Sequence, residues 1–570
     1  MLANVRRRLI AIMAVLTLFG SLVLAQLVRL HVVERDYWWS IGRARQSSTR
    51  EVEPERGRIW DRNGVLLAGN KPRFQVWIER AALADGEDNW AVLIRDVAPV
   101  LGFTPDEMRA TLSGEQARVM LKTDLDAALG ERLIAQNVPG LDVVAYWQRD
   151  YPERALAAST LGFYNAEHKG YYGLEGFYDG VLAGEKRVFE VDQDVWQDPL
   201  PLNVPPDSFA PAGADLIVTI DRTVQMVVEE ELARALETSG AAGGTIIVMD
   251  PRTGELLALA SAPAYDPNTY TDTAQTDPDR FVNPAVSGLY EPGSVFKIIT
   301  LAAALDAGLV TPDATYVDTA CLEVGGQPLC NWDRKDHGIV SMVDMMAKSL
   351  NVGAATLSTR LGAPTFYAYV RAFGFGQLTG VDLQAEAAGE VRTPADVDWY
   401  ESDLGTNAFG QGLSATPLQL ISAVAAVAND GRLVRPHVVK AIVEGERVRQ
   451  AQRVEAGQPI RLETARTLTR VLVEAVAREV PQAQVPGYQI AGKTGTAQIP
   501  IAGGYDDPWT IASFVGYGPA SDPRLIVLVR LDRPTVSPWG SATAAPVFQR
   551  VAARLFPVLG IPPDSPTVSN

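Results

Sequence analysis

The chain has 570 residues, of which 47% are hydrophobic, so it has enough apolar material for more than one folded domain and is not a disordered protein. It carries 51 Lys and Arg against 68 Asp and Glu, a formal net charge of −17 at pH 7, and it has no long basic cluster. This acidic balance argues against a nucleic-acid partner.

The first predicted element is a membrane anchor. Arginines at 6–8 precede the uncharged stretch 9–28, which at about 1.5 Å per residue can cross a hydrocarbon layer of roughly 30 Å. A cleaved signal peptide is the alternative, but its apolar region usually runs about 7–15 residues and ends in a small-residue cleavage site, which is weak here. Because the basic side is expected in the cytoplasm, we expect a cytoplasmic tail over 1–8, a transmembrane helix over 9–28, and the rest outside the inner membrane of a bacterium.

A mixed α/β region follows the anchor. Short apolar runs such as RFQVWI alternate with helical stretches such as NWAVLIRDVAPVLG, and residues 61–64 predict a tight turn between extended segments. Prolines crowd between 199 and 213, which indicates a boundary. We therefore expect a first external domain over 29–212.

A second domain is predicted over 213–558, with a short tail over 559–570. ADLIVTID predicts a strand, RTVQMVVEEELARALETSG a helix that stops at Gly240, and GGTIIVMDPRTGELLALAS two strands around a turn. Helices follow up to residue 357 and again over 417–429, and LIVLVRL at 525–531 predicts a strand. Cys321 and Cys330 are the only cysteines; they can form a disulfide in an oxidising compartment, and two buried thiols are the alternative.

The stretch GYQIAGKTGTAQ, at 487–498, fits two incompatible motifs. Gly487, Gly492, Lys493 and Thr494 match the phosphate-binding pattern G-x-x-x-x-G-K-[ST], whereas Lys493 to Gly495 is also the K-T-G element of the serine acyltransferase set S-x-x-K, S-x-N, K-T-G. A phosphate loop needs a helix that opens at its Lys-Thr, and the glycines and prolines after it disfavour one. ATP is also scarce outside the membrane, so the sequence argues against an ATPase.

The other two elements of the acyltransferase set are present in order. SVFK places Ser294 and Lys297 at i, i+3 on one face of a predicted helix, and SLN places Ser349 and Asn351 on a predicted turn between helices. A serine hydroxyl needs a base to take its proton, and Ser-Lys pairs are a known variant. Lys297 can act as that base only if desolvation and a nearby cation, for which Lys493 is the candidate, lower its pKa. Each of the three motifs alone is weak evidence for function, and Ser294 alone could be a helix cap. All three motifs in this order predict a serine acyltransferase.

With these motifs, the sequence resembles the class B penicillin-binding proteins, monofunctional peptidoglycan transpeptidases. ERGRIWDRNGVLLA at 55–68 resembles the family's first pedestal motif, and RDYPERALAASTLGF and GYYGLEGFYDGVLAG resemble later ones. VMDPRTGELLALASAPAYDPN, FGFGQLTGVDLQAEAAG, FGQGLSATPLQL and ATAAPVFQRV continue the likeness over nearly the whole chain. One departure is Asn283-Pro284, where the family often has Asn-Arg.

The resemblance implies a fold and a mechanism. The fold is α/β (α+β), with a single N-terminal transmembrane helix, an elongated pedestal (dimerisation-type) domain, and a transpeptidase domain of the penicillin-binding, serine β-lactamase-like type. Ser294 would attack the carbonyl between the terminal D-alanines of a stem peptide with Lys297 as base, Ser349 would relay the proton, and Asn351 would hold the peptide amide. β-Lactams would mimic the donor peptide and block Ser294.

The K-T-G strand is implied to bind the substrate. Lys493, Thr494 and Thr496, with Gly495 between them, would hold the terminal carboxylate. The backbone N–H groups of Ser294 and Thr496 would form the oxyanion hole.

The resemblance also implies partners, namely peptidoglycan stem peptides, β-lactam inhibitors and, in the membrane, a polytopic glycan polymerase of the shape, elongation and division family. No metal or organic cofactor is expected, and His337, His437, Tyr505 and Trp509 are expected to have structural or packing roles. A β-lactamase or β-lactam sensor shares the motifs but does not need the pedestal, and a D,D-carboxypeptidase differs only in accepting water. A role in division or in elongation stays open.

Overall fold

The computed structural model describes residues 2–39, 47–52, 54–80, 87–114, 116, 118–192, 211–501 and 503–564. The chain forms two compact units. The smaller unit comprises Met1–Glu55, Pro72–Gln148 and Gly184–Ala212, and the larger unit comprises Arg56–Lys71, Arg149–Ala183 and Gly213–Asn570. The units are interleaved along the chain, and the continuous domains over 29–212 and 213–558 stay a prediction.

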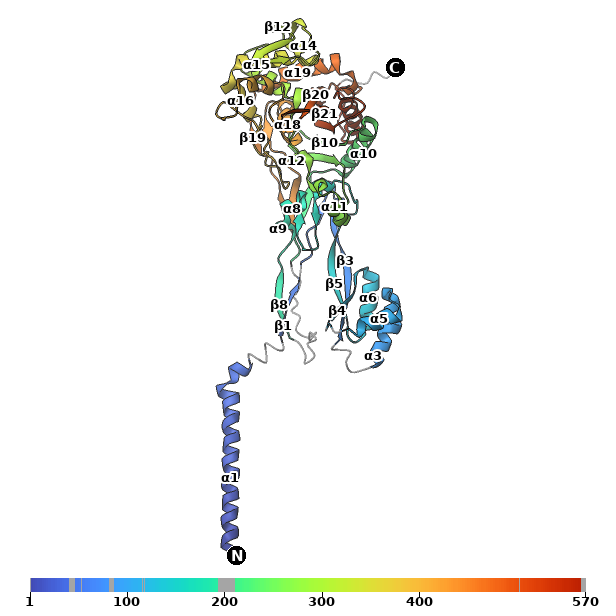
Figure 1. Ribbon diagram of the computed structural model, residues 1–570, viewed down its shortest axis with the longest axis vertical. Helices are drawn as coiled ribbons and strands as arrows, with labels where there is room; N and C mark the ends of the chain where they lie inside the picture. Colours follow the sequence, from blue (N-terminus) through green and yellow to red (C-terminus); the bar gives the residue numbers. More distant parts are fainter. Residues whose placement is uncertain are drawn as a thin grey trace. The chain divides into compact units, whose positions relative to one another are not determined.

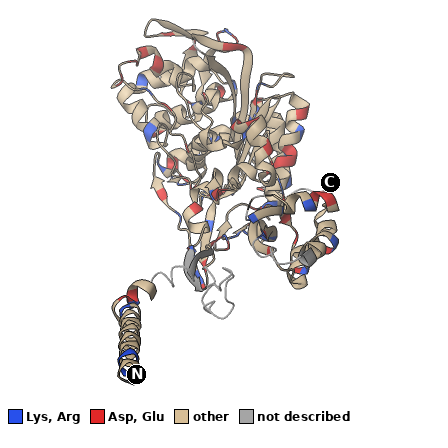
Figure 2. Ribbon diagram, turned by 60° about the horizontal axis from the view of Figure 1, so that its bottom comes forward, with Lys and Arg blue, Asp and Glu red and all other residues tan. Residues whose placement is uncertain are grey.

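The N-terminal helix has the length and composition of a membrane span. α1 (Leu2–Val28) continues into the π-helical segment η1 (Arg29–Val33), and an 18-residue window within Ala3–Val33 has a mean hydropathy of 2.3. The hydroxyls of Thr17 and Ser21 donate to the carbonyls four residues earlier, both at 2.8 Å, so the helix itself satisfies them. Figure 2 shows the charged residues of this segment at its two ends. The helix therefore begins before the predicted span and includes the basic residues.

The smaller unit builds its core from strands covered by short helices. The part of β3 (Leu66–Glu79) in this unit pairs with β4 (Arg118–Leu125), β5 (Leu141–Asp150) also pairs with β3, and β1 (Ser47–Val52) pairs with β8 (Arg187–Asp192). The helical elements are α3 (Glu87–Val92), η3 (Leu93–Val97), α4 (Ala98–Leu101), α5 (Pro105–Leu112) and α6 (Ala127–Gln136). Val76 and Ile78 alternate along β3 and are fully buried against Leu93 and Met108, which confirms both the RFQVWI strand and the NWAVLIRDVAPVLG helices.

A five-stranded antiparallel sheet lies at the centre of the larger unit. Its order is β11 (Leu256–Ala262), β10 (Gly243–Met249), β22 (Leu525–Asp532), β21 (Gly504–Gly518) and β20 (Ala491–Ile501). Successive side chains of β10 point to opposite faces, so Ile246 and Val248 enter one core while Ile247 and Met249 enter the other. The predicted β10–β11 hairpin and the predicted strand at 525–531 are confirmed.

Helices cover both faces of this sheet (Figure 1). On one face lie α10 (Arg222–Ser239), which ends at Gly240 in the left-handed conformation as predicted, and α20 (Ala544–Val558). On the other face lie α13 (Lys297–Asp306), α18 (Pro417–Ala428) and α19 (Leu462–Glu479). Because α13 is apolar all round except at its first turn, it is buried along almost its whole length.

The remaining elements of the larger unit are short. They are β2 (Ile59–Trp60), α7 (Ala158–Leu161), β6 (Phe163–Tyr164), β7 (Gly170–Tyr171), α8 (Gly173–Phe177), α9 (Asp179–Leu182), β9 (Asp215–Val218), α11 (Tyr270–Thr276), α12 (Pro284–Ser287), β12 (Thr315–Asp318), β13 (Cys321–Val324), β14 (Gln327–Cys330), β15 (Gly338–Ser341), α14 (Met342–Ala347), α15 (Asn351–Leu361), α16 (Ala363–Ala372), α17 (Glu401–Asn407), β16 (Leu433–Val434), β17 (Val439–Glu444), β18 (Arg447–Gln450) and β19 (Glu455–Gly457).

Two segments that precede residue 213 belong to the larger unit for physical reasons. Ile59 in β2 pairs in parallel with Leu216 in β9, which joins the first segment to a sheet of the larger unit. The fully buried Glu175 accepts hydrogen bonds from Arg56 and Arg149, both at 2.7 Å. Burial alone would raise the pKa of Glu175, but the two guanidinium groups outweigh it and lower that pKa. Arg56 lies in the first segment, and Arg149 and Glu175 lie in the second, so this network joins the two segments to each other.

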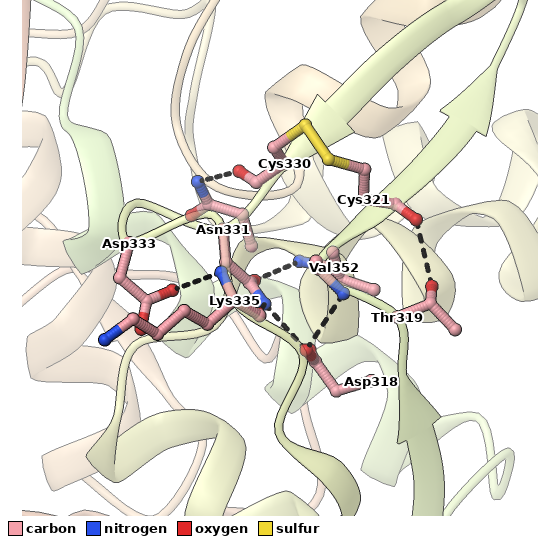
Figure 3. The surroundings of a disulfide bond; sticks show 10 residues. Asp318, Thr319, Cys321, Cys330, Asn331, Asp333, Lys335 and Val352 are labelled. Atoms are coloured by element: carbon pink, nitrogen blue, oxygen red, sulfur yellow. Dashed lines mark hydrogen bonds between the residues drawn. A yellow bond between two sulfur atoms is a disulfide. The ribbon is translucent and has the colours of Figure 1, made fainter.

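Cys321 and Cys330 form a disulfide with an S–S distance of 2.05 Å. They are directly opposite each other in the β13–β14 hairpin (Figure 3). The alternative of two buried thiols is therefore wrong.

Candidate active site

The nucleophile turn packs against β20 and leads directly into the buried helix α13. Ser294 lies in the 3-10 turn η7 (Gly293–Phe296), and Lys297 is the first residue of α13. Gly293 has φ +58°, and a Cβ there would lie 3.2 Å from the Cβ of Ala497 in β20, so the turn passes directly beside that strand. Residues at i and i+3 eclipse in a 3-10 turn, which brings the hydroxyl and the amine together. The predicted helical start is confirmed, with this tighter first turn.

Lys297 is fully buried and lies among the predicted site residues. Its Nζ is 3.0 Å from Ser294 Oγ, 3.2 Å from Ser349 Oγ and 2.7 Å from Asn351 Oδ1, and it also donates to the carbonyl of Ser349 at 2.7 Å. None of these partners is an anion, so the hydrogen bonds offset only part of the hydration that a buried ammonium loses.

The S-x-N residues lie on a turn between α14 and α15, as predicted. Ser349 has φ +57°, a left-handed conformation that is unusual for a residue with a side chain. This conformation aims its Oγ between two lysines, 3.2 Å from Lys297 Nζ and 3.0 Å from Lys493 Nζ. Asn351 begins α15.

Lys493 lies on β20 and has 3% of its surface exposed. Besides Ser349 Oγ, its Nζ contacts the carbonyl and the Oγ1 of Thr494, at 3.1 and 3.2 Å. Burial lowers the pKa of Lys493 to about 7. Burial, together with the nearby Lys493 ammonium, holds the pKa of Lys297 well below its usual range. The arrangement can thus supply a neutral amine at Ser294 and a partly protonated amine beside it.

The K-T-G strand is closely packed at Gly495. A Cβ on Gly495 would lie 2.4 Å from Ser513 Oγ, so only glycine fits there. Thr496 Oγ1 accepts a hydrogen bond from Gly540 N at 3.1 Å, which links β20 to the loop before α20. Because the chain continues as a strand after Lys493 and does not open a helix, the structure also argues against a phosphate loop.

Several residues beside the site were not singled out from the sequence. Trp332 and Trp539 contact each other edge to face, with ring centroids 5.4 Å apart, and both are about half exposed. A Cβ on Gly540 would lie 2.4 Å from the carbonyls of Gly495 and Ser513. No fixed spacing links these residues to the three motifs, so only the folded chain shows that they are neighbours of the site.

The other conspicuous residues have partners outside the cluster of lysines and serines, and the hydroxyl of Tyr505 bonds to Glu291, three residues before Ser294. His337 Nε2 is 3.2 Å from Asp333 Oδ2 in a loop, and His437 pairs through its backbone with Glu255. Tyr505 lies on β21 and is 37% exposed.

A serine that faces a buried lysine of lowered pKa, with a second serine shared by two lysines, defines a serine acyltransferase with a lysine base.

The comparisons with known proteins identify the family. Residues 244–553 match the penicillin binding protein transpeptidase domain, and residues 51–199 match the penicillin-binding protein dimerisation domain. The chain belongs to the penicillin-binding protein transpeptidase family, as the motifs predicted, and its reaction class is acyl transfer in peptidoglycan crosslinking.

Relatives cover nearly the whole chain. Stage V sporulation protein D of Bacillus subtilis is 32% identical over 98% of this chain and 87% of its own length. The peptidoglycan D,D-transpeptidase FtsI homolog of Mesostigma viride is 26% identical over 97% of this chain and 96% of its own length. Among solved structures, penicillin binding protein 3 from Mycobacterium tuberculosis, complexed with aztreonam, has a TM-score of 0.70 and 29% identity, and the match covers 91% of this chain and 99% of that chain.

Proposed function

We propose that this enzyme crosslinks peptidoglycan through an acyl-enzyme on Ser294, with Lys297 as the general base. The observation that carries the assignment is the 3.0 Å contact between Lys297 Nζ and Ser294 Oγ, at an amine whose pKa burial and Lys493 depress. A neutral amine at that position can accept the hydroxyl proton as the new bond forms.

In the first step, Ser294 Oγ bonds to the carbonyl carbon between the two terminal D-alanines of a donor stem peptide. Its proton passes to Lys297 Nζ, and the C–N bond to the last D-alanine breaks. The leaving amine takes a proton through Ser349, whose Oγ contacts both lysines. In the second step, an amine of a neighbouring stem peptide attacks the ester, its proton returns to Ser294 by the same route, and the crosslink is released.

The proposed substrate contacts are those that the family resemblance implies. Lys493, protonated in part near neutral pH, binds the terminal carboxylate together with Thr494 and Thr496, while Asn351 holds the peptide amide. Gly495 lets β20 lie close to the nucleophile turn. The backbone N–H groups of Ser294 and Thr496 stabilise the negative charge that develops on the carbonyl oxygen.

Penicillin acylation tests the assignment. Intact-mass analysis should show one covalent adduct, located by digestion on the peptide that contains YEPGSVFK. Ser294→Ala should abolish the adduct, and Lys297→Ala should lower the acylation rate by about 10²–10⁴-fold. Ser287→Ala is the matched control, because that serine donates to Ala385 O and does not contact either lysine in the described part of the chain. An adduct that persists in Ser294→Ala would show that the nucleophile is misassigned.

The acceptor is tested separately. Turnover of a stem-peptide donor with an added amine acceptor should give the crosslinked product, and turnover without it should be slow. Equal release of D-alanine by water alone would instead indicate a D,D-carboxypeptidase.

We further propose that the protein spans the inner membrane of a bacterium once, with 1–8 in the cytoplasm, 9–28 as the anchor and the catalytic domain (213–558, before a tail at 559–570) outside. The arginines at 6–8 and the uncharged stretch that follows support this orientation. The disulfide supports an oxidising compartment for the catalytic domain.

We also propose that the anchor and the pedestal (29–212) contact a polytopic glycan polymerase of the shape, elongation and division family. Replacing 9–28 with an unrelated apolar helix should keep the protein in the membrane and leave penicillin acylation intact, but abolish stimulation of the polymerase. Equal stimulation by the replaced form would refute the contact through the anchor.

A further inference from the structure

Three consecutive residues hold the turn that carries Ser349. We define this turn as residues 348–352 and the holding segment as residues 330–332. The bonds join Cys330 O to Asn351 Nδ2 (2.9 Å), Asn331 Oδ1 to Val352 N (3.1 Å) and Trp332 Nε1 to Lys348 O (3.2 Å). They therefore fix the turn on both sides of Ser349.

The turn needs such support because Ser349 has φ +57°. A left-handed residue with a side chain costs free energy and persists only where its surroundings impose it. If the turn relaxed, Ser349 Oγ would leave its place between Lys297 and Lys493, and Asn351 Oδ1 would move away from Lys297.

The holding segment is itself rigidly anchored. The disulfide closes the hairpin that ends at Cys330. Asn331 is 2% exposed, its Nδ2 donates to Asp318 Oδ1 at 2.7 Å, and its backbone N donates to Ala320 O at 2.9 Å. Asp318 is also buried and accepts a bond from His337 N. Figure 3 shows Asn331 between Asp318 and the Val352 backbone, so it links the hairpin to the start of α15.

We propose that Asn331 and Trp332 are positioning residues of the transpeptidase reaction. Together with the Cys330 carbonyl, they hold Ser349 and Asn351 against Lys297 through the three bonds. This role rests on the proposed function of the site. The ring of Trp332 also contacts Trp539 at the surface, so an experiment must separate the indole N–H bond from a contact of the ring with a ligand.

Stopped-flow acylation with a fluorescent penicillin separates these roles, because it yields the dissociation constant of the first complex and the acylation rate constant. Trp332→Phe keeps an aromatic ring but removes the N–H donor, and it should lower the acylation rate constant about 5–10-fold while the dissociation constant changes less than about twofold. Trp399→Phe is the matched control, since it removes an indole bond to Tyr367 OH that does not involve the turn.

Asn331→Ala should lower the same rate constant more, by about 10-fold or greater, because it frees both the Val352 N–H and the buried Asp318. Gln225→Ala is its control. Gln225 on α10 is also a fully buried amide, and its side chain bonds to the backbone of Leu259 on β11. If Asn331→Ala does not fold, Trp332→Phe alone decides the test.

An unchanged acylation rate in Trp332→Phe, with a raised dissociation constant in Trp332→Ala, would show that the ring only contacts the ligand and would overturn the proposal. A rate loss in Gln225→Ala equal to that in Asn331→Ala would do the same. These outcomes require that the wild-type protein forms an adduct on Ser294. If it forms none, both the proposed function and the positioning role are wrong. If it does, but Trp332→Phe and Asn331→Ala are acylated at the wild-type rate, only the positioning role is wrong.

Discussion

Removing the charge of Lys493 should raise the pKa of Lys297. Both amines lie within 3.2 Å of Ser349 Oγ, so they cannot be more than about 6 Å apart. At an effective dielectric constant of about 20, two like charges at that distance repel by about 3 kcal/mol, which corresponds to about 2 pKa units. Lys493→Met removes this penalty on protonated Lys297. A larger fraction of Lys297 is then protonated at a given pH, and the rising limb of the acylation profile moves to higher pH.

The assay is the pH dependence of the acylation rate for a chromogenic cephalosporin and for its methyl ester. The ester lacks the carboxylate, so it reports the shift of Lys297 without the loss of carboxylate binding. We expect the rising limb to move upward by as much as about 2 units in Lys493→Met. Thr494→Val is the control, since it removes a substrate contact but no charge and should leave the limb in place. A limb for Lys493→Met that coincides with that of the wild type would refute the electrostatic coupling of the two lysines.

Three further predictions concern stability and packing. Burial lowers the pKa of Lys493 to about 7 in the folded protein, against about 10.4 in the unfolded chain. Between these two values the unfolded chain binds more protons, so the free energy of unfolding should rise with pH. Lys493→Met should therefore raise the melting temperature at pH 6–7 and lose that advantage near pH 10. Gly495→Ala should slow acylation about 10²-fold, because its Cβ would lie 2.4 Å from Ser513 Oγ and displace β20; a normal rate would contradict this. Replacing Cys321 and Cys330 together by serine should cost about 2–3 kcal/mol in urea unfolding and slow acylation, and an unchanged rate would show that the hairpin holds without the bridge.

Local patterns predicted much of the fold. Continuous apolar runs, with a turn between the first two, predicted β10, β11 and β22, and the stop at Gly240 predicted the end of α10, because these signals depend on neighbours in the sequence. The interleaving of the two units was not predictable in this way. It depends on the pairing of Ile59 with Leu216 and on the Arg56–Glu175 ion pair, each of which joins residues more than a hundred positions apart.

The three motifs predicted which residues meet but not how they are held. Ser294, Ser349 and Lys493 were identified by type and order, and the structure brings all three to Lys297 or to one another. The support from Asn331 and Trp332 left no trace in the sequence, because an asparagine and a tryptophan after a strand are common and gain their role only when the hairpin folds against α15.

Three residues of this site break local rules. Lys297 and Lys493 are two basic groups buried together, which repel each other when both are protonated, and Ser349 has a left-handed backbone. Each feature costs folding free energy, so each persists only because the buried helix α13, the strand β20 and the disulfide hairpin impose it. The same features make the site reactive, since a hydrated Lys297 would stay protonated near neutral pH and a relaxed Ser349 would no longer bridge the two amines. Stability and reactivity are therefore opposed at these positions, and substitutions that relieve the strain should stabilise the fold while they slow acylation.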